Sequence, residues 1–174
     1  MGLQPRILYS DESRTIAVLD TVIVLVATRP VAPEHVRMIA DALAELTSTH
    51  PSRGIGYVHV IDSRPGDSRK QSDETRRAFI DLARSAPPQT RGVGVALLAE
   101  GFVAAAMRGI ISAAMSAFRT RIPMMVCGTV EETCQWLERM FYNANERVSG
   151  PELAHAIEAM RVALRRAPQN VTTA

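Results

Sequence analysis

The chain has 174 residues, enough for one domain with a substantial hydrophobic core. Hydrophobic residues make up 47% and charged residues 22% of the sequence, which is ordinary for a globular protein and argues against disorder. The net charge of +2 is too small to indicate a dedicated nucleic-acid binder.

The cysteine count and the apolar segments indicate the cellular location of the protein. Cys127 and Cys134 are too few for a disulfide framework or a four-ligand zinc site, so we expect reduced thiols. The N-terminal residues lack the charged region and apolar run of a signal peptide. The longest apolar stretch, residues 101–118, contains Arg108, which would be costly in lipid. We therefore expect a cytoplasmic protein without an integral membrane span.

The first half of the chain predicts four strands and two helices. Runs of apolar and β-branched residues indicate the strands, at residues 6–10, 15–19, 22–27 and 55–61. Asp20 and Thr21 can turn the chain between the second and third strands. Pro33 opens the first helix, and Ser72 can cap the second. A polar loop, residues 62–68, lies between the fourth strand and the second helix.

The second half predicts two strands and three helices. Short apolar runs indicate the strands, at residues 93–99 and 122–127. An apolar helix is expected between them, over residues 102–118. Thr129 and Ser149 each begin a capping box and open the last two helices. Residues 169–174 are expected to fray.

The order of these elements predicts the fold class. Helices and strands alternate after the third strand, and such alternation requires crossover connections. We expect an α/β fold with a mixed, largely parallel sheet of about five to six strands, an N-terminal antiparallel hairpin and five flanking helices. Residues 1–148 would form the domain, and the helix and frayed tail of residues 149–174 would pack on it.

The sequence offers no convincing set of catalytic groups. It has no Walker loop, no Gly-x-Gly-x-x-Gly and no Gly-x-Ser-x-Gly. The four histidines are scattered, and none stands at metal-ligand spacing with a cysteine or carboxylate. We therefore expect a protein that is not an enzyme and that holds no metal and no cofactor.

Two side-chain types leave alternatives open. His59 alternates with Tyr57 on one strand and is either a hydrogen-bonded core residue or a ligand-facing one. His35 and His155 are expected on polar helix surfaces. Cys127 precedes the start of a helix, where the dipole can favour a thiolate, although buried cysteines at strand ends are common.

The loop between the fourth strand and the second helix is the main candidate site. It follows the carboxyl end of a central strand, where open α/β sheets place their ligands. A serine at the following helix start can also accept a phosphate. The alternative is an ordinary solvated loop with a helix cap. The candidate partner-binding or phosphoacceptor residues are Asp62, Ser63, Asp67, Ser68 and Ser72.

The apolar helix of residues 102–118 is the second candidate. Small residues recur at every fourth position and form a smooth ridge, which permits close packing on the sheet, a homodimer contact or an apolar ligand groove. Methionines can line such a groove with adaptable surface. The candidate groove residues are Met107, Ile110, Met115 and Met124.

Three stretches of sequence resemble a known family. They are IAVLDTVIVLVATRPVAPEHVRMIADAL (residues 16–43), YVHVIDSRPGDSRKQSDETRRAFIDLA (57–83) and IPMMVCGTVEETCQWL (122–137). Together they resemble the hairpin, signature loop and last strand and helix of the STAS-like (SpoIIAA-like) domain of bacterial anti-sigma-factor antagonists and their Sec14-like relatives. In this resemblance Asp62 matches the first aspartate of the signature loop, and Ser68 or Ser72 stands near the phosphoacceptor position.

The resemblance implies a regulatory module in signal transduction. Its partner would be a protein, such as a kinase or an anti-sigma-type regulator, bound through the loop and helix start at residues 62–73. The Sec14-like relatives imply an alternative, a carrier or sensor of an apolar small molecule or lipid that uses the helix of residues 102–118.

Overall fold

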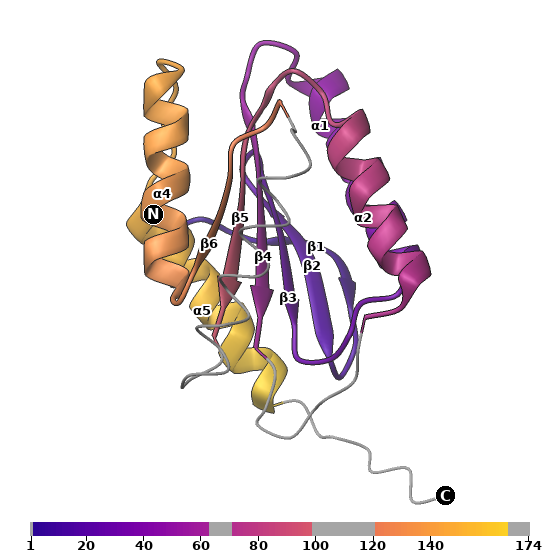
Figure 1. Ribbon diagram of the computed structural model, residues 1–174. Coiled ribbons are helices and arrows are strands. Elements are labelled where there is room, and N and C mark those ends of the chain that lie inside the picture. The colour runs from indigo at the N-terminus through magenta and orange to yellow at the C-terminus, as the bar shows by residue number, and fades with distance from the viewer. Residues whose placement is uncertain (1, 63–70, 99–120, 167–174) are drawn as a thin grey trace, which may run out of the picture.

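A computed structural model describes residues 2–62, 71–98 and 121–166. Within these ranges six strands form one mixed sheet in the order β1-β2-β3-β4-β5-β6 (Figure 1). The strands are β1 (Arg6–Ser10), β2 (Arg14–Leu19), β3 (Val22–Ala27), β4 (Ile55–Ile61), β5 (Thr90–Leu97) and β6 (Met124–Cys127). The described helices are α1 (Pro33–Thr49), α2 (Asp73–Ser85), α4 (Val130–Asn143) and α5 (Gly150–Arg166). The predicted α/β class is confirmed.

The first three strands form the antiparallel part of the sheet. Asp20, in the turn between β2 and β3, has a φ of 54°, in the left-handed region that aspartate tolerates. Arg53 donates hydrogen bonds of 2.8 and 2.5 Å to the Asp20 carboxylate. The turn predicted at this position is therefore fixed by its own backbone and by a distant side chain.

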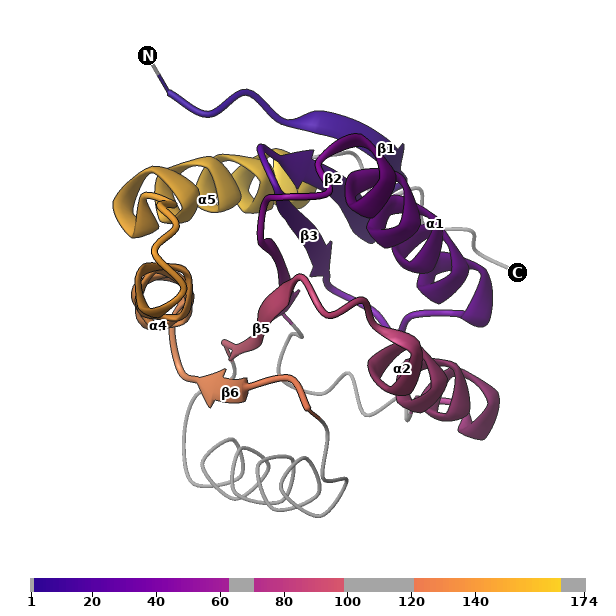
Figure 2. The same ribbon diagram turned by 90° about the horizontal axis from the view of Figure 1, so that it is seen from above.

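Strands β3 to β6 run parallel to one another. Helices α1 and α2 connect successive parallel strands and lie on one face of the sheet (Figure 2). Helices α4 and α5 lie on the other face. Every residue of β3 is buried, as expected of a strand that is covered on both sides.

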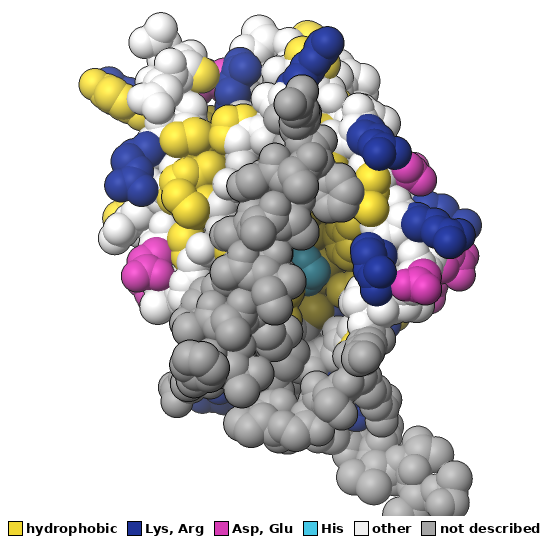
Figure 3. Space-filling model, viewed as in Figure 1, with side chains coloured by type: hydrophobic (Ala, Val, Ile, Leu, Met, Phe, Trp, Pro, Cys, Tyr) yellow, Lys and Arg dark blue, Asp and Glu magenta, His cyan; other side chains and the backbone are white. Residues whose placement is uncertain are grey.

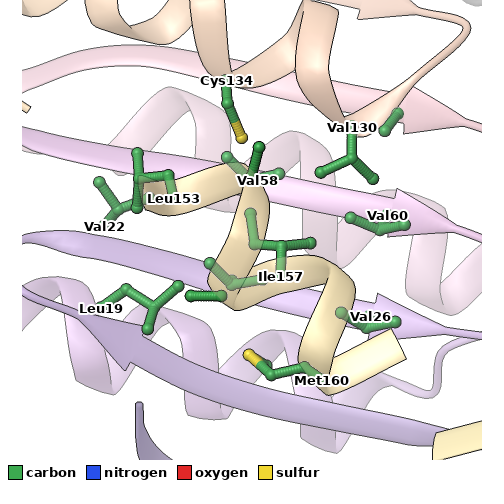
Figure 4. Packing of buried hydrophobic residues seen from close by; sticks show 14 of the residues in the cluster. Leu19, Val22, Val26, Val58, Val60, Val130, Cys134, Leu153, Ile157 and Met160 are labelled. Carbon is green, nitrogen blue, oxygen red and sulfur yellow. The ribbon is translucent and has the colours of Figure 1, made fainter. Parts of the chain in front are cut away.

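Helices α4 and α5 pack closely against their face of the sheet. Figure 4 shows Leu153, Ile157 and Met160 of α5 directed onto the strands. A Cβ atom on Gly94 of β5 would lie 2.4 Å from Cγ2 of Thr133 in α4, closer than real Cβ atoms approach their neighbours. Glycine therefore sets the distance between α4 and the sheet.

The structure also corrects some expectations. Strand β6 begins at Met124 rather than at residue 122, because Pro123 accepts a hydrogen bond from Val93 but has no N–H to donate. His35, expected on a polar surface, is only 2% exposed. The helix expected at residues 102–118 lies outside the described residues. Within the described ranges, no helix has both the length and the apolar character to cross a membrane.

Candidate functional site

Asp62, the first candidate loop residue, lies buried at the carboxyl end of β4. Its carboxylate accepts hydrogen bonds of 2.8 Å from Nε and 2.5 Å from Nη2 of Arg165. Nε of Arg161 lies 3.4 Å from the same carboxylate. These hydrogen bonds raise the pKa of Arg165. Asp62 therefore fastens α5 to the sheet, and with 4% of its surface exposed it offers little to a partner.

Ser72, at the other end of the loop, is the N-cap of α2. Its Oγ accepts a hydrogen bond of 3.1 Å from the Thr75 backbone N–H. Gln71 Nε2 donates to the Val31 carbonyl at 2.5 Å, and Thr75 Oγ1 donates to the same oxygen at 3.1 Å. The start of α2 is thus held against the segment before α1, while the Ser72 side chain stays exposed.

Most of the other candidates lie outside the described residues. These are Ser63, Asp67 and Ser68 of the loop, and Met107, Ile110 and Met115 of the apolar helix. Their roles stay predictions. Met124, the remaining groove candidate, is half-buried in β6.

Met124 shares a sheet face with two aromatic residues of β4. The register aligns Tyr57 with Val93 and Val93 with Met124, so these three form one row across three parallel strands. His59 lies two residues beyond Tyr57 on the same strand and therefore on the same face. This is the face that carries α1 and α2, because Tyr57 and Val93 belong to its hydrophobic cluster. We refer to the surface formed by Tyr57, His59, Val93, Met124 and Phe79 of α2 as the aromatic face.

Tyr57 contributes an unsatisfied hydroxyl to the aromatic face. The residue is 5% exposed, and within the described part of the chain its Oη has no hydrogen-bond partner. Burial raises the pKa of this hydroxyl above its ordinary value, so it stays protonated. It is therefore available to donate one hydrogen bond in an apolar setting.

His59 contributes a neutral imidazole. Its ring stacks on Phe79 with centroids 5.7 Å apart and lies 6.3 Å from the Tyr57 ring. Burial lowers the pKa of His59 to about 4, so the ring carries no charge at neutral pH. A neutral imidazole has one donor and one acceptor nitrogen. The sequence left open whether His59 is a core residue or a ligand-facing one. The structure shows a neutral ring among apolar side chains.

Part of the aromatic face reaches the surface of the molecule. Phe79 and Val93 are only half-buried, and Thr75 is the one buried residue of α2. Figure 3 shows hydrophobic side chains reaching the surface on the sheet side of α2. The aromatic face therefore combines accessible apolar surface with a buried donor.

Sequence reasoning missed a polar cluster around His35. Arg14 Nη1 lies 3.3 Å from His35 Nε2, and the Tyr9 ring packs edge-on against the imidazole. Tyr9 donates to Asp11 at 2.8 Å, and the Asp11 carboxylate also accepts from the backbone of Ser13. The cluster joins side chains of β1, β2 and α1, so no local sequence pattern indicates it. Tyr9, Asp11 and Arg14 Nη1 are paired within the cluster, whereas Arg14 Nε is buried without a partner among the described residues. We assign the cluster to the stability of the hairpin and α1.

The cysteines do not form a reactive site. Burial raises the pKa of the Cys127 thiol, and this outweighs its hydrogen bond with Thr133. Burial also raises the pKa of Cys134, to about 12. Both are free thiols in their neutral form at physiological pH. Among the described residues no group of three His, Cys, Asp or Glu side chains could hold a metal ion.

No protein-family model matches the chain, and comparisons with curated proteins and with solved structures find no match either. Function must therefore be inferred from the side chains themselves.

Proposed function

We propose that this protein is a non-catalytic binding module that holds a small, uncharged, largely apolar molecule on the aromatic face. The observation that supports this most directly is the Tyr57 hydroxyl, buried without a hydrogen-bond partner among the described residues. An unpaired buried hydroxyl costs about 1–3 kcal/mol. A ligand with a carbonyl or ether oxygen would accept the hydrogen bond and remove that cost.

The chemistry of the neighbouring side chains narrows the ligand class. The desolvation that keeps His59 neutral would also disfavour a charged ligand. Phe79, Val93 and Met124 supply apolar surface, and methionine adapts its shape readily. An uncharged molecule with an apolar body and one or two polar atoms satisfies all of these groups.

The resemblance to STAS-like domains supports the same class of function. The Sec14-like relatives imply apolar ligands, and the wider group implies regulatory binding rather than catalysis. We extend the proposal to the setting that this resemblance implies, a cytoplasmic regulatory protein of bacterial signal transduction.

Binding of a fluorescent ketone tests the proposal. Prodan is an uncharged naphthalene ketone whose emission shifts to the blue in apolar sites. We expect the purified protein to bind it, and Tyr57→Phe to weaken binding about three- to tenfold, because one hydrogen bond contributes about 0.5–1.5 kcal/mol. Tyr142→Phe is the matched control, since Tyr142 is 74% exposed. Native mass spectrometry should also detect a co-purifying neutral molecule.

Two results would overturn the proposal. One is the absence of both Prodan binding and a co-purifying molecule from a correctly folded protein. The other is Prodan binding that Tyr57→Phe and Tyr142→Phe leave equally unchanged.

A second candidate function is the protein-interaction module expected from the loop at residues 62–73. It is favoured by the hydrogen bonds of Gln71 and Thr75 to Val31, which hold the exposed start of α2 in one position. If this function includes a phosphorylation switch, protein isolated from its native cells should carry phosphate on Ser63, Ser68 or Ser72. Ser85, exposed at the other end of α2, is the control serine, and phosphate confined to Ser85 or absent altogether would contradict the switch.

A further inference from the structure

A second surface, independent of the aromatic face, lies beside α5. There a groove of about 730 Å³ separates α5 from β1 and the N-terminal segment. Three alanines of α5 form one wall, namely Ala156, Ala159 and Ala163, and Leu3 and Pro5 line the opposite side. Ile7 of β1 lines the groove and is 49% exposed, so it adds apolar surface to the groove.

The groove lies where the helix layer on this face ends. Within the described residues, α4 packs against β4, β5 and β6, and α5 packs against β2 and β3 (Figure 2). Two strand spacings amount to about 9.6 Å, which matches the 8–10 Å between packed helices. One further helix beside α5 would therefore lie along the β1 edge of the sheet, next to Ile7.

The walls of the groove suit a helix. Alanine side chains let a second helix approach α5 closely, because they add little width to the contact. The lining runs along α5 from Pro151 to Leu164, a rise of about 20 Å at ~1.5 Å per residue. That length matches three to four turns of a partner helix.

A partner strand fits less well. Pro5 precedes β1, Arg6 at its start pairs with Glu45 at 2.9 Å, and the register shifts between Ile7 and Tyr9. A proline, a charge and a bulge are the features that keep an edge strand from pairing with another chain. The unprotected surface here is the groove and not the strand edge.

The charges of the groove indicate the chemistry of its partner. The described lining residues include Asp11 and Glu152 and contain no lysine or arginine, although the chain has 20 basic residues. Asp11 already contacts Arg14, at 3.7 Å, whereas Glu152 has no ion pair among the described residues. A basic residue on the partner would pair with Glu152 at the N-terminal end of α5.

We infer that this groove docks an amphipathic helix of another protein, with an apolar stripe on Ile7 and the alanine wall and a basic residue at Glu152. Such helix-in-groove binding draws its affinity from apolar anchors, and charge sets its orientation. The inference does not depend on the ligand proposed for the aromatic face.

Two synthetic peptides test the inference on the full-length protein. Both are amphipathic helices of about 18 residues with a Leu/Ala stripe; one carries lysines at its ends and the other glutamates. Fluorescence anisotropy should show binding of the lysine peptide and at least tenfold weaker binding of the glutamate peptide. Glu152→Lys should reduce that preference. Ala159→Phe, which fills the groove, should weaken binding of the lysine peptide at least tenfold.

Val162→Ser is the matched control, since Val162 is exposed on α5 but does not line the groove. Circular dichroism would verify that each variant is folded. The inference is overturned if neither peptide binds, or if Ala159→Phe and Val162→Ser have the same effect. It is also overturned if light scattering shows a dimer that Ala159→Phe dissociates, because the occupant is then a second copy. If Ala159→Phe abolishes Prodan binding, the inference is overturned as well, because the groove then holds a small apolar ligand.

Discussion

The two faces of the sheet are packed by different rules. Under α4 and α5 a cluster of buried hydrophobic side chains packs the helices onto the strands, and the missing Cβ of Gly94 lets α4 come close to the sheet. On the aromatic face the sheet carries a histidine, a tyrosine hydroxyl without a partner in the described part of the chain, and apolar residues that are half-buried. Buried polar atoms in proteins are usually paired, so a buried hydroxyl without a partner beside accessible apolar surface calls for a separate explanation. We therefore place the candidate functional site on the aromatic face.

The tightly packed face is the one that a small substitution should damage most. Gly94→Ala places a Cβ 2.4 Å from Thr133 Cγ2 and forces α4 outward. We expect the free energy of unfolding to fall by about 2–3 kcal/mol, measured by urea denaturation. Val93→Ile, one residue away on the half-buried opposite face, should cost less than about 1 kcal/mol. If both variants lower the free energy of unfolding by the same amount, the two faces do not differ in how tightly they are packed.

The ion pair that holds α5 to the sheet gives the next largest effect. Asp62→Asn removes the charge that Arg165 and Arg161 share, and we expect a loss of about 2 kcal/mol. The expected loss is below that of a fully buried pair because the Arg165 side chain is 50% exposed. A double-mutant cycle with Arg165→Met should show that most of this loss is coupling between the two residues. If the single losses simply add, Asp62 does not act through Arg165.

The contrast between these regions also explains what the sequence could reveal. Strands and helix caps follow local rules, and the Thr129 cap is present as expected, with its Oγ1 accepting from Glu132 N at 3.1 Å. The Asp62–Arg165 pair joins residues 103 positions apart, and no local pattern encodes it. His35 was misjudged for the same reason, since its burial depends on Tyr9 and Arg14 of other elements.

The candidate sites were predictable only as regions. The sequence pointed to His59 through its alternation with Tyr57, but strand periodicity cannot tell a paired polar atom from an unpaired one. That distinction needs the positions of all neighbouring atoms. The groove beside α5 gave no sequence signal, because alanine is a common residue of any helix.

A pH series sharpens the description of the aromatic face. The pKa of His59 is about 4 in the folded protein and 6.5 as a free side chain. Between these values the unfolded chain binds a proton that the folded chain does not, so stability is full above pH 6.5 and decreases as the pH falls toward 4. From pH 7 to pH 5 we expect a loss of about 1–2 kcal/mol. His59→Phe should abolish this loss, whereas His155→Gln, at an exposed position, should retain it.

The smallest expected effect is that of Tyr57→Phe on the free energy of unfolding, and its sign depends on whether a ligand is bound. In ligand-free protein, Tyr57→Phe removes a buried hydroxyl that has no partner within the described residues, so we expect the free energy of unfolding to rise by up to about 1 kcal/mol. With a ligand bound through that hydroxyl, the same substitution should lower stability, because the variant loses the ligand's contribution. Thermal denaturation before and after extraction of bound molecules should therefore reverse the sign. A variant that is destabilised by the same amount in both preparations would show that the hydroxyl serves the fold and not a ligand.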